Sequence, residues 1–165
     1  MSCDSFYLLV KNLYWRNVKY ENGLYTLPVP FSVLEQDGWV IDSAPTDIIS
    51  AKDTSFGFVL RKGNQTLRTA LYNEFNKATS PENCLVTTII SDDFNSKFEI
   101  ELPKGIKIGS TKKEVEDAYS SLSPIIGEST NYITYTYRSK VQQEIDIIIS
   151  KDTNKVSKIE VQFIP

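Results

Sequence analysis

The chain has 165 residues, 41% of them hydrophobic, which is enough apolar material for a folded domain with a real core and argues against a disordered chain. Its formal net charge is only −3 and its lysines are interspersed with acidic residues, so no basic patch for nucleic acid or a membrane surface is indicated. The absence of histidine excludes histidine-activated nucleophiles, the HExxH zinc motif and histidine acid–base catalysis. No apolar run reaches the roughly 20 residues of a membrane span.

The first segment, residues 1–20, is predicted to be helical from Asp4 to about Arg16, because its apolar residues follow a three–four spacing. These residues are Phe6, Leu9, Val10 and Leu13.

A first structural unit is predicted over residues 21–95. It opens with a strand at 24–27, and Ser32 and Glu35 then predict a capping box at the start of a short helix that Gly38 ends. The rest of this unit alternates apolar and polar residues or is rich in β-branched ones, which is typical of strands. The three expected strands cover residues 55–61, 66–72 and 84–90.

A second unit is predicted over residues 96–165. Thr111 and Glu114 form another capping-box pattern, which predicts a helix over 111–120. Four strands are expected around it, at 98–102, 132–138, 143–150 and 155–163. Alternation places one apolar face of these strands in the core, consisting of Phe98, Ile100, Ile145, Ile147, Ile149, Ile159 and Val161.

The two units follow the same order of strand, helix and three strands. We therefore predict an α+β fold, in which a tandem repeat of these units forms one compact domain with an antiparallel sheet and helices on one face. A chance similarity of two modules is the alternative, since short capping boxes recur often.

The segment 102–119 resembles a family signature, G-I-x-I-G-x-T-x-x-E-V-x-x-A-Y, of β-lactamase-inhibitor-protein-like and SmpA/OmlA-like modules. It carries this pattern from Gly105-Ile106 to Ala118-Tyr119. Residues 145–163 resemble the terminal hairpin of the same modules. Residues 26–28 and Gly38-Trp39 resemble the first half of tandem, putative lipoprotein-like members from Gram-positive bacteria, so the resemblance covers residues 20–165.

The resemblance implies a tandem module, usually at the bacterial cell envelope, that presents a sheet face to another protein. Ser120-Ser121 replaces the family's glycine after the helix, and no lipobox precedes Cys3, so lipid anchoring is not carried over. The loop residues that inhibit β-lactamase have no match here, and fold alone does not imply function. We expect an extracytoplasmic, envelope location if a leader has been removed and a cytoplasmic one otherwise.

The acidic and cysteine residues do not predict a catalytic or metal site. Turns at 92–95 and 152–154 contain Asp and Asn but lack the spacing, glycine and closing glutamate of a calcium loop. Glu99 and Glu101 fit a solvated strand face better than an acid–base pair. Cys3 and Cys84 are too few for a zinc site; a bridge between them and an ordinary buried thiol at Cys84 both remain open. We expect no enzyme activity and no cofactor.

Aromatic and polar residues on the solvent-facing side of the predicted sheet form the predicted binding face. Alternation along the strands predicts that four aromatic residues point into the core: Phe56, Phe58, Tyr135 and Tyr137. Two others, Tyr72 and Tyr132, are predicted to point to the opposite face. The expected binding residues are Arg68, Tyr72, Tyr132, Thr134, Thr136, Arg138 and Asp146, with an ordinary hydrated sheet as the alternative. We hypothesise a protein-binding module of unknown partner; the alternative is a cytoplasmic or phage-type inhibitor or immunity protein that binds a toxin or an enzyme.

Overall fold

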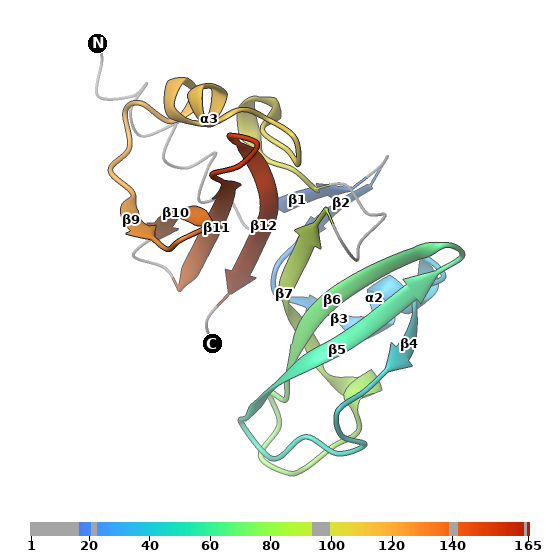
Figure 1. The fold of residues 1–165 in the computed structure, drawn as a ribbon. Coiled ribbons are helices and arrows are strands. Elements are labelled where there is room, and N and C mark those ends of the chain that lie inside the picture. Colours follow the sequence, from blue (N-terminus) through green and yellow to red (C-terminus); the bar gives the residue numbers. More distant parts are fainter. Residues whose placement is uncertain (1–16, 21–22, 94–99, 139–141, 164) are drawn as a thin grey trace, which may run out of the picture.

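The computed structural model describes residues 17–20, 23–93, 100–138, 142–163 and 165 (Figure 1). Their main feature is a nine-stranded antiparallel sheet. Its strands are β3 (Val29–Pro30), β4 (Val40–Ser43), β5 (Thr54–Lys62), β6 (Gln65–Tyr72), β7 (Leu85–Asp92), β9 (Ile125–Glu128), β10 (Tyr132–Arg138), β11 (Gln143–Ser150) and β12 (Lys155–Phe163).

The order across this sheet is β4-β5-β6-β7-β12-β11-β10-β9, with β3 added beside β7. The two longest-range neighbours, β7 and β12, therefore meet in the middle, and the strands before each of them extend outward to the two edges (Figure 1). Five register pairs join them, from Lys158 opposite Asp92 to Gln162 opposite Thr88. This β7–β12 seam connects the two halves of the chain into a single sheet.

Alternation along the strands buries one face of the sheet, as predicted. Six of the seven expected core residues are buried, and the seventh, Phe98, lies outside the described residues. The buried set is Ile145, Ile147, Ile149, Ile159 and Val161 of the main sheet, together with Ile100, which lies outside this sheet.

Two short α-helices contribute to the same core: α2 (Phe31–Gln36) through Phe31 and Leu34, and α3 (Lys112–Ala118) through Val115. Tyr119, directly after α3, packs edge-on against Tyr137 of β10 with ring centroids 5.5 Å apart. Two single-turn 3-10 helices, η1 (Pro81–Asn83) and η2 (Pro103–Gly105), complete the helical elements among the described residues.

The predicted α+β class is wrong, because the fold is β-rich: 51% strand against 15% helix. The capping and periodicity signals indicate that helices exist but not how long they are. A helix of seven residues is only about 10 Å long, whereas eight strands side by side span roughly 34 Å. The two helices therefore do not form a layer over one face of the sheet, and the sheet itself supplies most of the core.

The two predicted capping boxes have different outcomes. In α3, Thr111 accepts a hydrogen bond from the Glu114 N–H, and the Glu114 carboxylate accepts one from the Thr111 N–H at 2.6 Å, so this box is confirmed. In α2 the prediction is wrong: the helix begins one residue earlier, after Pro30, without a side-chain cap. Its first N–H, on Phe31, donates instead to the Cys84 carbonyl at 3.0 Å, which ties the helix to the chain just before β7.

A second, three-stranded sheet joins the first described residues to residues 100–101, with the order β2-β1-β8. It consists of β1 (Asn17–Tyr20), β2 (Gly23–Thr26) and β8 (Ile100–Glu101). The predicted helix from Asp4 to Arg16 lies outside the described residues, but the end of the segment 1–20 is strand, since β1 occupies 17–20. Residues 98–102 were expected in the main sheet, and their described part pairs with β1 instead.

A buried amide holds the two loops at one end of the first half. The Asn73 side chain is fully buried, and its Nδ2 lies 2.8–2.9 Å from the carbonyls of Ile49, Ser50 and Lys77. Its Oδ1 accepts a hydrogen bond from the Phe75 N–H at 2.9 Å. One polar side chain thereby fixes the loops before β5 and after β6 against each other.

Candidate functional site: the outer face of the sheet

The candidate site lies on the polar face of the main sheet, opposite the buried apolar side chains; we call it the outer face. Strand pairing places its residues in register rows that cross the sheet. One row runs Arg68, Ile90, Glu160, Asp146, Thr136 and Ile125, from β6 to β9. Three predicted site residues, Arg68, Thr136 and Asp146, therefore lie in a single row.

A second row brings Arg138 into the same surface. It runs Phe56, Ala70, Thr88, Gln162, Glu144 and Arg138, from β5 to β10. With neighbouring strands about 4.8 Å apart, these six strands span roughly 24 Å. Thr134 lies in a third row with Ile148, Lys158 and Asp92.

Glu144 is the centre of a cross-strand cluster at one end of the outer face. It is nearly buried, and it accepts hydrogen bonds from Arg138 Nε and, at 2.9 Å, from Gln162 Nε2. The hydrogen bond raises the pKa of Arg138 further. The carboxylate thereby fixes the guanidinium above it, because the arginine, 63% exposed, reaches solvent while the 10% exposed glutamate does not.

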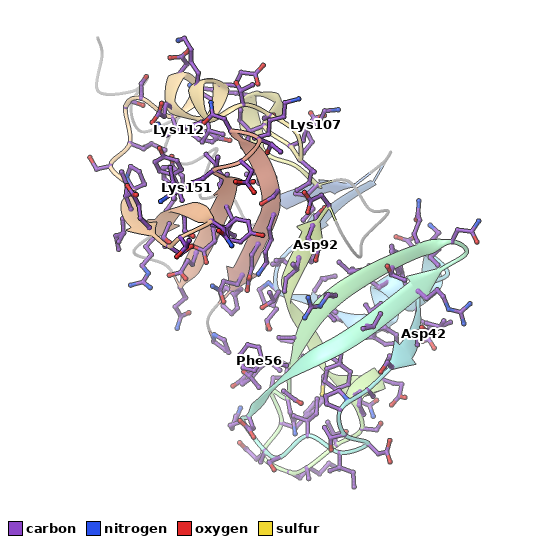
Figure 2. All side chains as sticks on the ribbon, in the orientation of Figure 1. Asp42, Phe56, Asp92, Lys107, Lys112 and Lys151 are labelled. Carbon is purple, nitrogen blue, oxygen red and sulfur yellow. The ribbon has the colours of Figure 1, made fainter. Side chains whose placement is uncertain are left out.

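An exposed arginine also pairs with a nearly buried carboxylate at Arg68 and Asp92, where Nη1 and Oδ2 lie 4.0 Å apart. The arginine side chain is 49% exposed and the aspartate 11%. Lys158 also exceeds its partner Glu160 in exposure, with 2.8 Å between Nζ and Oε2. In each of these three pairs the cation is more exposed than its carboxylate partner, and the carboxylates of Glu144 and Asp92 are nearly shielded from solvent (Asp92 is labelled in Figure 2).

Asp146 lies in the middle of this surface, on β11. Thr136 Oγ1 donates to its Oδ1 at 2.5 Å across the β10–β11 pair. Burial raises the pKa of this carboxyl, the Thr136 hydrogen bond opposes that effect, and the nearby Glu144 and Glu160 add to it. The fold consequently disfavours the ionisation of Asp146.

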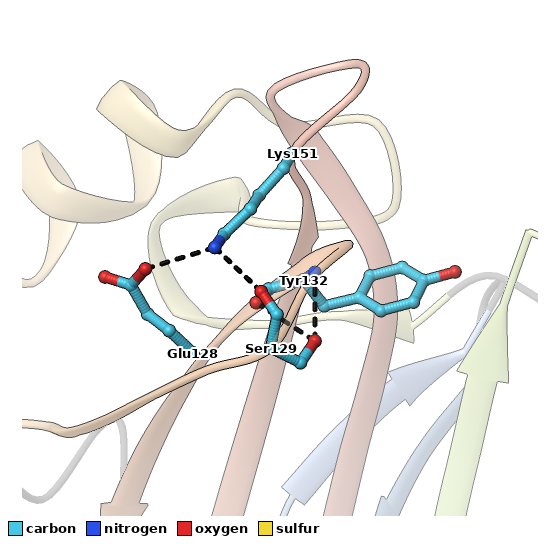
Figure 3. Close-up of polar contacts among 4 residues, drawn as sticks. All are labelled: Glu128, Ser129, Tyr132 and Lys151. Carbon is cyan, nitrogen blue, oxygen red and sulfur yellow. Dashed lines mark hydrogen bonds and ion pairs between the residues drawn. The ribbon is translucent and has the colours of Figure 1, made fainter.

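The two tyrosines of the predicted site do not join the cluster. Tyr132 is 38% exposed and begins β10, where its N–H donates a hydrogen bond to Ser129 Oγ at 3.1 Å (Figure 3). Six residues of extended strand separate it from Arg138, which is roughly 20 Å. Tyr72 is half-buried at the end of β6, opposite Thr54 and Leu85, on the other side of the rows from Tyr132.

Phe56 is the residue of this surface that the sequence reasoning missed. Strict alternation along the strand predicts that Phe56 is in the core with Phe58, but it is 67% exposed and projects from β5 (Figure 2). A register shift between Phe56 and Phe58 reverses the alternation, and Gly57 between them has a φ of 89° that favours glycine. Gly57 inside an alternating strand is itself the signal of such a bulge.

The described residues contain no group of three or more His, Cys, Asp or Glu side chains placed to hold a metal ion. Cys84 is a buried free thiol whose pKa burial and the neighbouring Glu82 raise to about 11, while Cys3 lies outside the described residues. Within the described part of the chain, no helix has the length and apolar character needed to cross a membrane.

Comparison with known proteins finds no match to the chain among protein-family models, curated proteins or solved structures. The resemblance of residues 102–119 to β-lactamase-inhibitor-protein-like and SmpA/OmlA-like modules therefore stays a prediction.

Proposed function

We propose that the chain is a non-enzymatic module that binds an acidic surface of another protein with the outer face of its sheet. The observation that carries the proposal is shared by three ion pairs of the outer face: the cation is more exposed than its carboxylate partner, most clearly at Arg138–Glu144 and Arg68–Asp92. The absence of histidine from the sequence and the family resemblance support a binding role over catalysis.

The arrangement favours binding because the cations are already ordered. An exposed arginine normally loses side-chain entropy when a partner fixes it. Here Arg138 and Arg68 each lie against a carboxylate in a neighbouring strand, so part of that ordering occurs in the free protein. Opposite charges on the partner then increase the association rate and fix its orientation.

Aromatic side chains at the margins add apolar contact area. Phe56 ends the row that contains Arg138, and Tyr132 is exposed at the start of the same strand as Arg138. Aromatic residues and arginine are the types most often found to dominate binding energy. An acidic partner surface with an apolar centre or rim fits this combination.

The test is affinity capture from the source cells with immobilised wild type beside Arg68→Gln/Arg138→Gln. We expect the double variant to lose the partner at least tenfold and the wild-type interaction to weaken with salt. Lys113→Gln is the matched control, because this exposed lysine pairs with Asp117 on α3 rather than on the sheet. It should retain the partner.

If the folded double variant retains every partner, the outer-face proposal fails. The loops at residues 41–54 and 74–83 then become the next candidate surface, since Ile48 and Phe75 are exposed there. The identity of the captured protein distinguishes an envelope component from a toxin or an enzyme.

A further inference from the structure

β9 is the strand at one edge of the main sheet. It pairs with β10 on one side, and no described strand pairs with its other side. All four residues of β9 are exposed, and Ile125 and Ile126 are each 57% exposed although they point to opposite faces. An open edge with apolar residues on both faces is a template for pairing with another strand.

The opposite edge of the sheet, β4, is protected. Its register with β5 shifts between Ile41 and Ser43, and such irregularities hinder the addition of a further strand. Asp42 on this edge pairs with Arg61 at 2.6 Å, which adds fixed charges there. The β9–β10 register, in contrast, runs without a shift.

The charge on β9 is already compensated within the chain. Lys151 Nζ lies 3.1 Å from Glu128 Oε2 and donates to the Ser129 carbonyl at 2.7 Å (Figure 3). Glu128 therefore brings less repulsion to an approaching strand than a free carboxylate.

The direction of the backbone groups follows from one hydrogen bond at the end of the strand. The Ser129 N–H donates to the Tyr132 carbonyl at 2.9 Å, so residue 129 faces β10. Because hydrogen bonding alternates along an antiparallel strand, Gly127 and Ile125 also face β10. The N–H and C=O groups of Ile126 and Glu128 consequently point away from the sheet.

Gly127 indicates close approach by another backbone. Its φ is not in the left-handed range, and a Cβ added there would meet no atom within 4 Å, so neither the local conformation nor the packing within the chain requires glycine. Glycine in a strand weakens that strand and often marks a site where a second backbone approaches. The open space lies on the outer face, in line with Ile125.

We propose that β9 pairs antiparallel with β9 of a second copy of this chain, about a twofold axis at Gly127. In this register each outward-facing Ile126 lies opposite Glu128 of the second copy, and the two glycines face each other. The carboxylates do not meet, both sets of outward backbone groups are hydrogen-bonded, and the isoleucines of both copies are shielded. A twofold contact requires a surface that is complementary to itself. The β9 edge meets this requirement in the register centred on Gly127, so a second copy fits it.

The first experiment is sedimentation equilibrium of the whole chain from micromolar to millimolar concentration. A four-residue strand forms a small interface, so we expect a weak monomer–dimer equilibrium. Ile126→Pro removes one outward N–H and leaves the β10 hydrogen bonds in place; it should abolish the dimer. Ile126→Ala keeps that N–H and should still dimerise, although more weakly.

A wild type that stays monomeric throughout, or a dimer unaffected by Ile126→Pro, would overturn the proposal. Since Ile126→Pro could also disturb folding, a second measurement uses cysteine pairs oxidised by glutathione disulfide, which is reduced as the two thiols join. In a Cys3→Ser background, Gly127→Cys should form a disulfide-linked dimer, because directly opposed residues of this kind have Cα atoms about 4.5 Å apart. Ser43→Cys, on the β4 edge, should not. Failure of the Gly127→Cys pair to link, or preferential linking at Ser43→Cys, would refute pairing at β9.

Discussion

At the scale of single residues, Asp146 gives a pH dependence that can be measured. Burial raises its pKa above the ordinary 3.8, so the folded protein holds this proton more tightly than the unfolded chain does. The protonated group therefore stabilises the fold below about pH 4, and that contribution is lost as the pH rises through the raised pKa. Asp146→Asn removes the ionisation and still accepts the Thr136 hydrogen bond.

We expect Asp146→Asn to gain stability relative to wild type when the pH is raised from 3 to 7, as measured by urea unfolding. Asp47→Asn makes the same charge change in an exposed loop and serves as the control. A difference between Asp146→Asn and wild type that stays constant with pH would contradict the assigned role of burial.

Residue-level prediction succeeded where alternation is unbroken and failed where it is interrupted. Ile145, Ile147 and Ile149 are all buried, as their parity indicates. Phe56 is exposed because the bulge at Gly57 moves the side chains that precede it to the opposite face of the sheet. A prediction from strict alternation assumes that no residue is inserted in the strand. The polar partners of Arg138 and Thr136 could not be predicted from the alternation of β10 alone. The register between β10 and β11 places Glu144 beside Arg138 and Asp146 beside Thr136.

At the scale of elements, the two helix starts provide a direct comparison. Thr111→Ala removes the hydroxyl that accepts the Glu114 N–H and should destabilise the protein by about 1 kcal/mol. Ser32→Ala should cost less or be neutral, because Ser32 lies inside α2 and makes no cap, and alanine favours helix. Thermal unfolding of both variants checks the pair. Equal losses would mean that Thr111 acts through something other than its cap.

The sequence predicted long strands better than short ones. Residues 132–138, 143–150 and 155–163 are strands with the expected bounds, because each carries several alternations. β1, β3, β4 and β9 were missed and β2 was predicted one residue late, at 24–27, since two to four residues provide too few alternations to define a period. The start of α2 was predicted one residue too late, because the Ser32 pattern suggested a cap where the helix has none. The helix begins directly after Pro30, and the hydrogen bond from the Phe31 N–H to the Cys84 carbonyl is a tertiary contact that the local sequence does not contain.

At the scale of the whole molecule, the β7–β12 seam predicts cooperative unfolding of the two halves. Ile159 is fully buried on the seam opposite Ser91, and Ile159→Ala should destabilise the protein by about 2–5 kcal/mol. In a Trp15→Phe background, Trp39 fluorescence reports on the first half while far-UV circular dichroism reports on both. The two transitions should shift together. If the Trp39 signal keeps its midpoint while the dichroism shifts, the halves unfold separately.

The order of strands across the sheet is the part of the fold that local patterns do not contain. Each hairpin follows from its own turn and alternation, but the pairing of β7 with β12 joins residues more than sixty positions apart. The outer face exists as one surface because of that pairing, since Arg68 and Arg138 lie on different sides of the seam. The prediction that the two arginines belong to one site used only the alternation of side chains along each strand.

The position of β12 also has a consequence for biosynthesis. The central place in the sheet belongs to the strand that is synthesised last among those described, so β7 lacks its neighbour while the ribosome completes residues 93–154. The first half emerges early and exposes the unpaired backbone of the β7 edge for that whole interval, and unpaired strand edges make incomplete chains prone to aggregate. The sheet is therefore completed only after residues 155–163 have been synthesised, and termination before β12 should yield a product that the cell's chaperones and proteases remove.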